Sequence, residues 1–152
     1  GSIRMAFYGD ARSNIANSLI LAARLTGMEL VLSSPEEEKP NAELYAGCPN
    51  VCWEPDPLKA AKGVDYFYTD VWVSMGFEDE RERRMKLFKP YQVNEKLFSV
   101  AKPGAKFLHC LPAHRGEEVS AGVMDDPVKS IVFDEAENRL HVQKAVMALL
   151  MK

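Results

Sequence analysis

The sequence predicts a single α/β domain built on a doubly wound, mostly parallel β-sheet with helices on both faces. Short apolar runs of strand length alternate with helix-like segments along the whole chain, an order typical of parallel sheets with right-handed crossovers. Two of these runs end abruptly in polar, chemically capable side chains, as strands do at the carboxyl edge of an open sheet. The chain has 152 residues, 47% hydrophobic and 27% charged, which suits one core of ordinary size, and we place the domain at residues 3–152.

The elements follow from apolar spacing and from the residues that start and stop each segment. In chain order, strands are expected over residues 3–8, 29–32, 51–53, 65–69, 105–108 and 130–133. Helices are expected over residues 14–26, 57–62, 78–88, 94–101 and 135–150, with a further short helix ending near residue 46. The first helix has the clearest signals. Ser13 or Asn14 can cap it, Ile15 and Leu19 lie at helical spacing, and Gly27 supplies its C-terminal stop.

Three other segments have clear local signals. Residues 33–41 are rich in proline and glutamate and are expected to form a loop. Pro57 lies at the start of its short helix, where its missing N–H has no consequence. The stretch 78–89 is highly charged, so we interpret it as the solvated face of a helix.

Composition excludes several classes of protein. No apolar run approaches the ~20 residues that a membrane helix needs, and a net charge of −3 argues against a nucleic-acid partner. Three cysteines cannot form a complete disulfide framework. Cys48 and Cys52 could be a metal pair, but no second pair follows, so we expect no metal and reduced thiols in a cytoplasmic protein. Gly1 and Ser2 look like a cloning scar.

Two runs carry the chemistry. Residues 107–112, Phe-Leu-His-Cys-Leu-Pro, place His109 and Cys110 at the end of a buried strand, and Pro112 should end its ladder. Residues 70–76, Asp-Val-Trp-Val-Ser-Met-Gly, follow another strand with a carboxylate and then a hydroxyl. The turn at residues 9–14 lacks the G-x-G-x-x-G pattern of a dinucleotide site, but its helix N-terminus attracts anions.

Together these runs resemble the ornithine carbamoyltransferases, and the resemblance extends over nearly the whole chain. The Tyr91-Gln92 pair and the stretches at residues 109–119 and 133–139 also look like that family, in its order. Family members have two domains, and this chain looks like the second, ornithine-binding one only. The Ser-Thr-Arg-Thr-type phosphate loop of the first domain does not occur in these residues.

The resemblance implies roles for residues whose spacing leaves alternatives open. For ornithine it implies contacts from four residues: Asn14, Asp70, Ser74 and Met75. For carbamoyl phosphate it implies contacts from His109, Cys110, Leu111 and Arg139, with Asp70, Cys110 and Arg139 as catalytic residues and a cis Leu111–Pro112 bond. From spacing alone, Asn14 could instead cap its helix, and Asp70 could be a solvated strand end or a cap. Cys110 could be an inert buried thiol, and Arg139 could pair with Glu135 four residues earlier.

The implied activity is carbamoyl transfer from carbamoyl phosphate to the side-chain amine of L-ornithine, with no cofactor. The isolated domain is expected to be inactive because it lacks the phosphate loop. Alternatives are a carbamoyltransferase for putrescine or acylated ornithine, and a non-catalytic binding or folding module. The apolar stripe of the last helix predicts self-association, or folding of that helix onto the sheet in place of the missing domain. The stripe consists of Val142, Ala145, Val146, Leu149 and Leu150.

Overall fold

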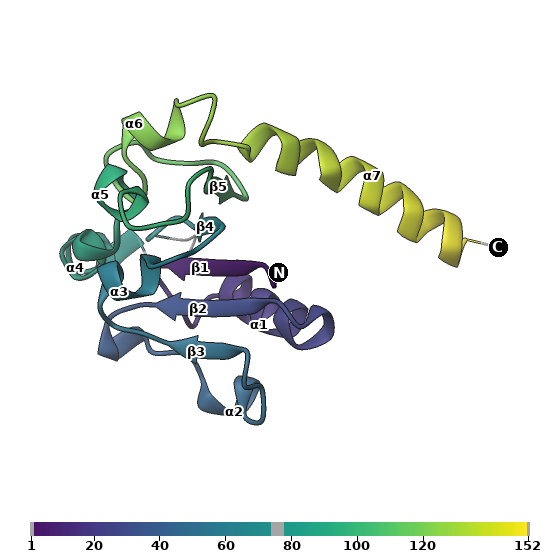
Figure 1. The fold of residues 1–152 in the computed structure, drawn as a ribbon, viewed down its shortest axis with the longest axis horizontal. Coiled ribbons are helices and arrows are strands. Elements are labelled where there is room, and N and C mark those ends of the chain that lie inside the picture. Colours follow the sequence, from purple (N-terminus) through teal and green to yellow (C-terminus); the bar gives the residue numbers. More distant parts are fainter. Residues whose placement is uncertain (1, 74–77, 152) are drawn as a thin grey trace.

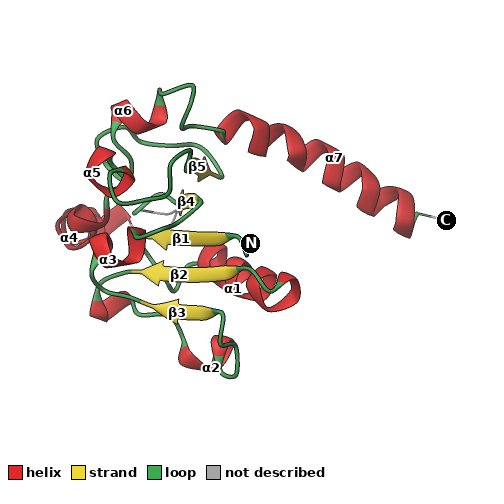
Figure 2. Cartoon of the chain, viewed as in Figure 1, coloured by secondary structure: helices red, strands yellow, loops and turns green. Residues whose placement is uncertain are grey.

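The computed structural model, which describes residues 2–73 and 78–151, has a parallel β-sheet at its centre (Figures 1 and 2). Five strands, β1 Arg4–Tyr8, β2 Glu29–Ser33, β3 Val51–Trp53, β4 Tyr66–Thr69 and β5 Lys106–His109, pair in the order β3-β2-β1-β4-β5. All four pairings are parallel. The predicted fold class is therefore confirmed. The order reverses direction between β1 and β4, which is where open α/β sheets bind their ligands.

Helices cover both faces of this sheet. They are α1 Asn14–Thr26, α2 Ala42–Tyr45, α3 Pro57–Ala61, α4 Arg81–Phe88, α5 Glu95–Phe98, α6 Ala121–Met124 and α7 Val132–Leu150. Short 3₁₀ turns η1 Glu36–Glu38, η2 Glu78–Glu80 and η3 Lys89–Tyr91 lie between them. Helix α1 begins after Ser13, whose side chain accepts from the Ala16 amide, and ends at Gly27 in the left-handed region. Both predicted signals of this helix are thus present, with Ser13 as the cap.

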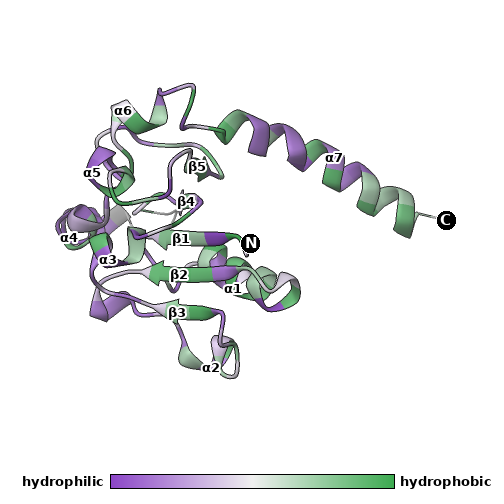
Figure 3. Ribbon diagram, in the orientation of Figure 1, coloured by the Kyte–Doolittle hydropathy of each residue, from purple (hydrophilic) through white to green (hydrophobic). Residues whose placement is uncertain are grey.

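The core divides into two clusters because successive strand residues point to opposite faces. In β1, Ala6 and Tyr8 belong to the cluster that includes residues of α3 and α5, whereas Phe7 packs with the residues of α1. The middle of the sheet is thus buried on both sides, and the middle of β2 has a hydrophobic colour in Figure 3. A sheet covered in this way leaves its carboxyl edge as the place where polar side chains can meet.

The sixth strand expected at residues 130–133 is wrong. Ser130 makes only an isolated bridge with Phe107, and α7 has begun by Val132. Acidic residues Asp134 and Glu135 in the first turn favour a helix start, and Glu135 also accepts hydrogen bonds from two groups of the sheet. The aromatic Phe133, which seemed to belong to a strand, is 76% exposed.

Helix α7 extends away from the body of the domain (Figure 1). Every residue from 136 to 150 is exposed, including the predicted apolar stripe. Of the two expected outcomes for this helix, folding onto the sheet is therefore wrong, and self-association stays a prediction. Within the described part of the chain, no helix is both long enough and apolar enough to cross a membrane.

Candidate functional site

The carboxyl ends of three neighbouring strands lie in register. Tyr8 of β1 is paired with Thr69 of β4, and Thr69 with His109 of β5. The Thr69 hydroxyl donates to the Tyr8 carbonyl oxygen at 2.8 Å, which ties two of these ends together. Because the ends are level, the next residue of β4 and the next residue of β5, Asp70 and Cys110, emerge side by side.

Asp70 and Cys110 are in direct contact. The Cys110 thiol donates to Oδ1 of Asp70, with 3.3 Å between Sγ and the oxygen, and the Val71 amide donates to the same oxygen at 2.8 Å. Burial, followed by the Asp70 carboxylate, raises the pKa of Cys110 to about 12. The thiol is therefore protonated at neutral pH. It is a hydrogen-bonding neighbour of a carboxylate, not a thiolate.

Glu135 fixes the start of α7 to the same strand ends. Its Oε1 accepts from the Tyr68 hydroxyl at 2.7 Å, and its Oε2 accepts from the His109 amide at 2.9 Å. Burial and the hydrogen bond to Glu135 raise the pKa of Tyr68. Glu135 thus has no ion pair with Arg139 among those found in the described residues, so the alternative of a surface pair four residues apart is not realised.

His109 is buried and acts on the loop that follows it. The Leu111 amide donates to Nδ1 at 2.9 Å, which leaves the ring proton on Nε2, where it faces Glu118 Oε1 at 3.2 Å. Leu111 has a positive φ of 58°, and the Leu111–Pro112 bond is cis, as the sequence resemblance implied. A left-handed leucine is a conformation that proteins concentrate at functional sites. His109 therefore holds an unusual turn beside Cys110.

Arg139 lies on the exposed side of this turn. A surface hollow of about 660 Å³ is lined by one turn of the loop and the facing residues of α7: Cys110, Leu111, Pro112, Ala136, Arg139, Leu140 and Gln143. Three predicted site residues, Cys110, Leu111 and Arg139, thus share one hollow. The guanidinium is available to an anionic group there.

Asn14 lies apart from this hollow. It is exposed in the first turn of α1, next to the capping Ser13, and lines a separate hollow of about 550 Å³ with Arg12 and Arg83. The structure thus brings Asp70, Cys110, Leu111 and Arg139 together and leaves Asn14 on the neighbouring strand end. Ser74, Met75 and Gly76 lie outside the described residues.

The sequence reasoning missed Arg84. We interpreted residues 78–89 as a solvated face, yet the Arg84 side chain is only 3% exposed. Its Nε donates to the Trp72 carbonyl oxygen and a terminal nitrogen donates to Asp10, both at 2.6 Å, while Glu38 lies 3.8 Å away. Its guanidinium also packs over the Phe88 ring at 5.0 Å. Arg84 lies four residues before Phe88, and this spacing is the signal that could have placed it on the buried side of α4.

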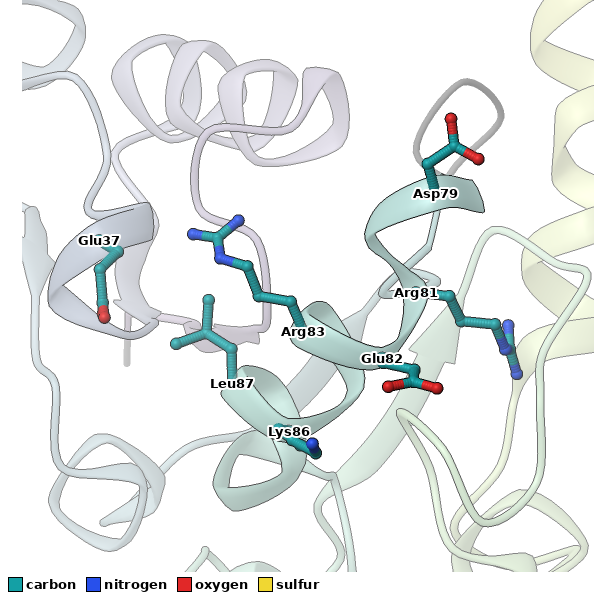
Figure 4. A pocket seen from close by; sticks show the side chains of 7 residues that line it. All are labelled: Glu37, Asp79, Arg81, Glu82, Arg83, Lys86 and Leu87. Carbon is teal, nitrogen blue, oxygen red and sulfur yellow. The ribbon is translucent and has the colours of Figure 1, made fainter.

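Arg84 therefore ties the segment after β4 to the segment after β1. Both segments leave the strands that flank the point where the sheet order reverses, so this buried cation holds the two segments together there. A larger hollow of about 840 Å³ lies between η1 and α4 (Figure 4). Charged side chains of both signs line it, and none of the predicted site residues does, so we assign it no role in the chemistry.

Comparison with known proteins gives consistent matches. Residues 2–150 match the family model described as aspartate/ornithine carbamoyltransferase, Asp/Orn binding domain. The ornithine carbamoyltransferase of Geobacillus stearothermophilus is 49% identical over an alignment of 153 positions, which takes in 95% of this chain and 49% of the relative. The solved ornithine carbamoyltransferase from Pyrococcus furiosus superposes with a TM-score of 0.90 at 46% identity, over 99% of this chain and 50% of that one. The anabolic ornithine carbamoyltransferase from Campylobacter jejuni gives a TM-score of 0.89 at 37% identity, over 99% of this chain and 52% of that chain. The chain thus spans about half the length of the relatives it matches.

Proposed function

Because the chain belongs to the aspartate/ornithine carbamoyltransferase family, as its Asp/Orn binding domain, we propose that it is the ornithine-binding half of an ornithine carbamoyltransferase. In the complete enzyme the ornithine side-chain nitrogen attacks the carbonyl carbon of carbamoyl phosphate. The new C–N bond forms, the C–O bond to phosphate breaks, and the amine loses a proton. Citrulline and phosphate are the products.

The observation that carries this proposal is the contact between Asp70 and Cys110. A carboxylate at a strand end, at the point where the sheet order reverses, suits an ammonium group through charge-assisted hydrogen bonds. The neutral Cys110 thiol would keep this carboxylate oriented. The partly buried thiol would also lie beside the reacting amine, and it would take no part in covalent catalysis.

The remaining roles follow the same edge of the sheet. Arg139 would polarise the carbamoyl oxygen or hold its phosphate from the hollow it shares with Leu111. The carbonyl groups of Cys110 and Leu111 would accept from the carbamoyl NH₂, and His109 would contribute by holding Leu111 in place. Asn14, with Ser74 and Met75, would bind the α-carboxylate and α-ammonium groups of ornithine.

Titration of the domain with ornithine tests the binding proposal. We expect weak saturable binding with a Kd near ~1 mM, corresponding to ~4 kcal/mol. Asp70→Ala should remove it, and Asp134→Ala, an exposed carboxylate on α7, should leave it intact. Putrescine and N-acetylornithine should bind at least about tenfold more weakly, since each lacks part of the free amino-acid group. An isotherm for Asp70→Ala that matches the parent would refute the assignment.

The domain alone should show no carbamoyl transfer above background, because its sequence contains no Ser-Thr-Arg-Thr-type phosphate loop. Turnover of ornithine and carbamoyl phosphate by pure residues 1–152 would contradict this. We also infer a cytoplasmic location, which is supported by the three free cysteines.

The exposed stripe on α7 supports a second proposal about partners. In the complete enzyme the other domain would cover it, and in this chain alone a second copy would do so. Val142, Val146 and Leu149 are 60%, 47% and 72% exposed, a patch that favours association. Sedimentation should show a dimer or larger species for residues 1–152 and a monomer for a chain ending at Asn138. A monomeric longer chain at high concentration would overturn this proposal.

A further inference from the structure

A second group of chemically capable side chains lies in the loop behind the Cys110 turn. His114, Glu117 and Glu118 each offer one ligand atom, and these atoms lie within 4.8 Å of one another. Imidazole nitrogen and carboxylate oxygen are a ligand set suited to Zn²⁺ and similar divalent transition metals. The group is separate from the substrate roles proposed above.

The backbone of this loop brings the three side chains together. The Glu117 amide donates to the His114 carbonyl oxygen at 3.0 Å, and the Gly116 amide donates to the Val119 carbonyl oxygen at 2.8 Å. Gly116 has a positive φ of 86°, which closes this turn. The Gln92 side-chain amide donates to both the Gly116 and Glu117 carbonyl oxygens, at 3.1 and 2.8 Å. The turn is therefore fixed without any ligand.

Glu118 supplies an independent indication of a ligand. Its side chain is fully buried, and Oε1 accepts from the His114 amide at 2.5 Å and faces Nε2 of His109. Its other oxygen, Oε2, is buried and has no hydrogen-bond partner. This orphaned oxygen points toward the ring of His114, whose Nδ1 is 3.8 Å away. A buried carboxylate oxygen without a partner is costly, and a cation would satisfy it.

We propose that His114, Glu117 and Glu118 form a binding site for a divalent transition-metal cation such as Zn²⁺. The three ligand atoms must move about 1–1.5 Å closer to one another before each can lie ~2.0–2.2 Å from a single Zn²⁺ ion. His114 can do so because its side chain is 50% exposed to solvent. Glu117 is held by Arg81, whose nitrogen lies 2.5 Å from its Oε1, so the cation would bind the remaining oxygen or compete with this arginine.

The site is connected to the substrate side of the loop through two hydrogen bonds. Glu118 holds His109, and His109 in turn holds the Leu111 amide. A cation bound to Glu118 would therefore fix the orientation of His109, and through it the turn next to Cys110. Outer-shell residues orient metal ligands through hydrogen bonds in the same way. Metal binding should also raise the unfolding temperature.

Zn²⁺ titration by calorimetry provides the test. The parent for all variants carries Cys48→Ser, Cys52→Ser and Cys110→Ser, so that thiols cannot bind the metal. We expect one Zn²⁺ per chain with a Kd below ~100 μM. His114→Gln and Glu117→Gln, both accessible to solvent, should each weaken binding at least ~10-fold.

The matched control is His141→Gln. His141 and Glu137 form an exposed pair on α7, 3.7 Å apart, with no buried carboxylate beside it. Its removal should leave the affinity unchanged. The proposal is overturned if Zn²⁺ fails to bind below ~1 mM, if His114→Gln and Glu117→Gln bind like the parent, or if His141→Gln loses as much affinity as they do.

Discussion

Replacing the Asp70 carboxylate by an amide should make Cys110 more acidic. The thiol donates to Oδ1 of Asp70 at 3.3 Å, and this carboxylate opposes formation of the thiolate both by its charge and by accepting the S–H proton. Asp70→Asn keeps the size of the side chain and removes the charge. Burial, the largest cause of the raised pKa, is left in place.

The expected change can be estimated from the contact. The pKa of Cys110 stands at about 12 against an ordinary value of 9.0, and burial accounts for the largest part of the difference. The charge and hydrogen bond of Asp70 come next, ahead of the more distant Glu135. Removing the charge should therefore lower the pKa by about one pH unit, so the thiolate fraction at pH 8 should rise ~10-fold.

The rate of alkylation by iodoacetamide reports this fraction, because the thiolate is the reacting species. The measurement uses a Cys48→Ser, Cys52→Ser parent, in which only Cys110 can react, over a range of pH. Asp134→Asn removes an exposed carboxylate from α7 and should leave the profile unchanged. An Asp70→Asn profile that coincides with that of the parent, or moves to higher pH, would show that Asp70 does not control this thiol.

Three further predictions concern stability and binding. Glu135→Ala leaves the Tyr68 hydroxyl and the His109 amide without their acceptor, so it should lower the free energy of unfolding in urea by ~3 kcal/mol. The control Glu137→Ala, at an exposed position of α7, should change this free energy by under ~0.5 kcal/mol. Equal effects of the two variants would contradict the role of Glu135. Arg84→Met leaves Asp10 without its buried cation and should cost ~3–5 kcal/mol in the same assay, so a loss under ~1 kcal/mol would refute the buried tie. Ser13→Ala should cost ~1 kcal/mol through the lost helix cap, while Asn14→Ala should affect ornithine affinity only; the reverse pattern would make Asn14 the cap.

The sequence was sufficient to predict the parts of the fold that depend on local chemistry. Apolar spacing located five strands to within about one residue, and Gly27 ended α1 as expected. The sixth strand failed because the run at residues 130–133 is apolar and short, a pattern that a buried strand and the start of a helix share. A long-range contact favours the helix here, because Glu135 accepts hydrogen bonds from Tyr68 of β4 and His109 of β5.

The meeting of Asp70 and Cys110 was predictable because each residue follows a strand end. Contacts that depend on burial in the tertiary structure were less so. The resemblance to a known family supplied the cis bond at Leu111–Pro112, which spacing alone does not indicate. Burial of Arg84 could not be expected from a stretch so rich in charge, since only the docking of α4 over the crevice removes it from water. The orphaned oxygen of Glu118 likewise exists only in the folded chain.

The attachment of α7 through Glu135 makes this helix a lever. The helix is about 28 Å long over its 19 residues, is fixed in its first turn by the bonds from the Tyr68 hydroxyl and the His109 amide to Glu135, and is exposed from residue 136 to residue 150. A neighbouring domain that bound the outer turns of α7 would act on the fixed first turn through the length of the helix. A displacement of several ångströms at the tip would reach the strand ends as a movement of a fraction of an ångström. A movement of the helix about this fixed end would therefore change the spacing between the Asp70 carboxylate, the Cys110 thiol and the turn at Leu111.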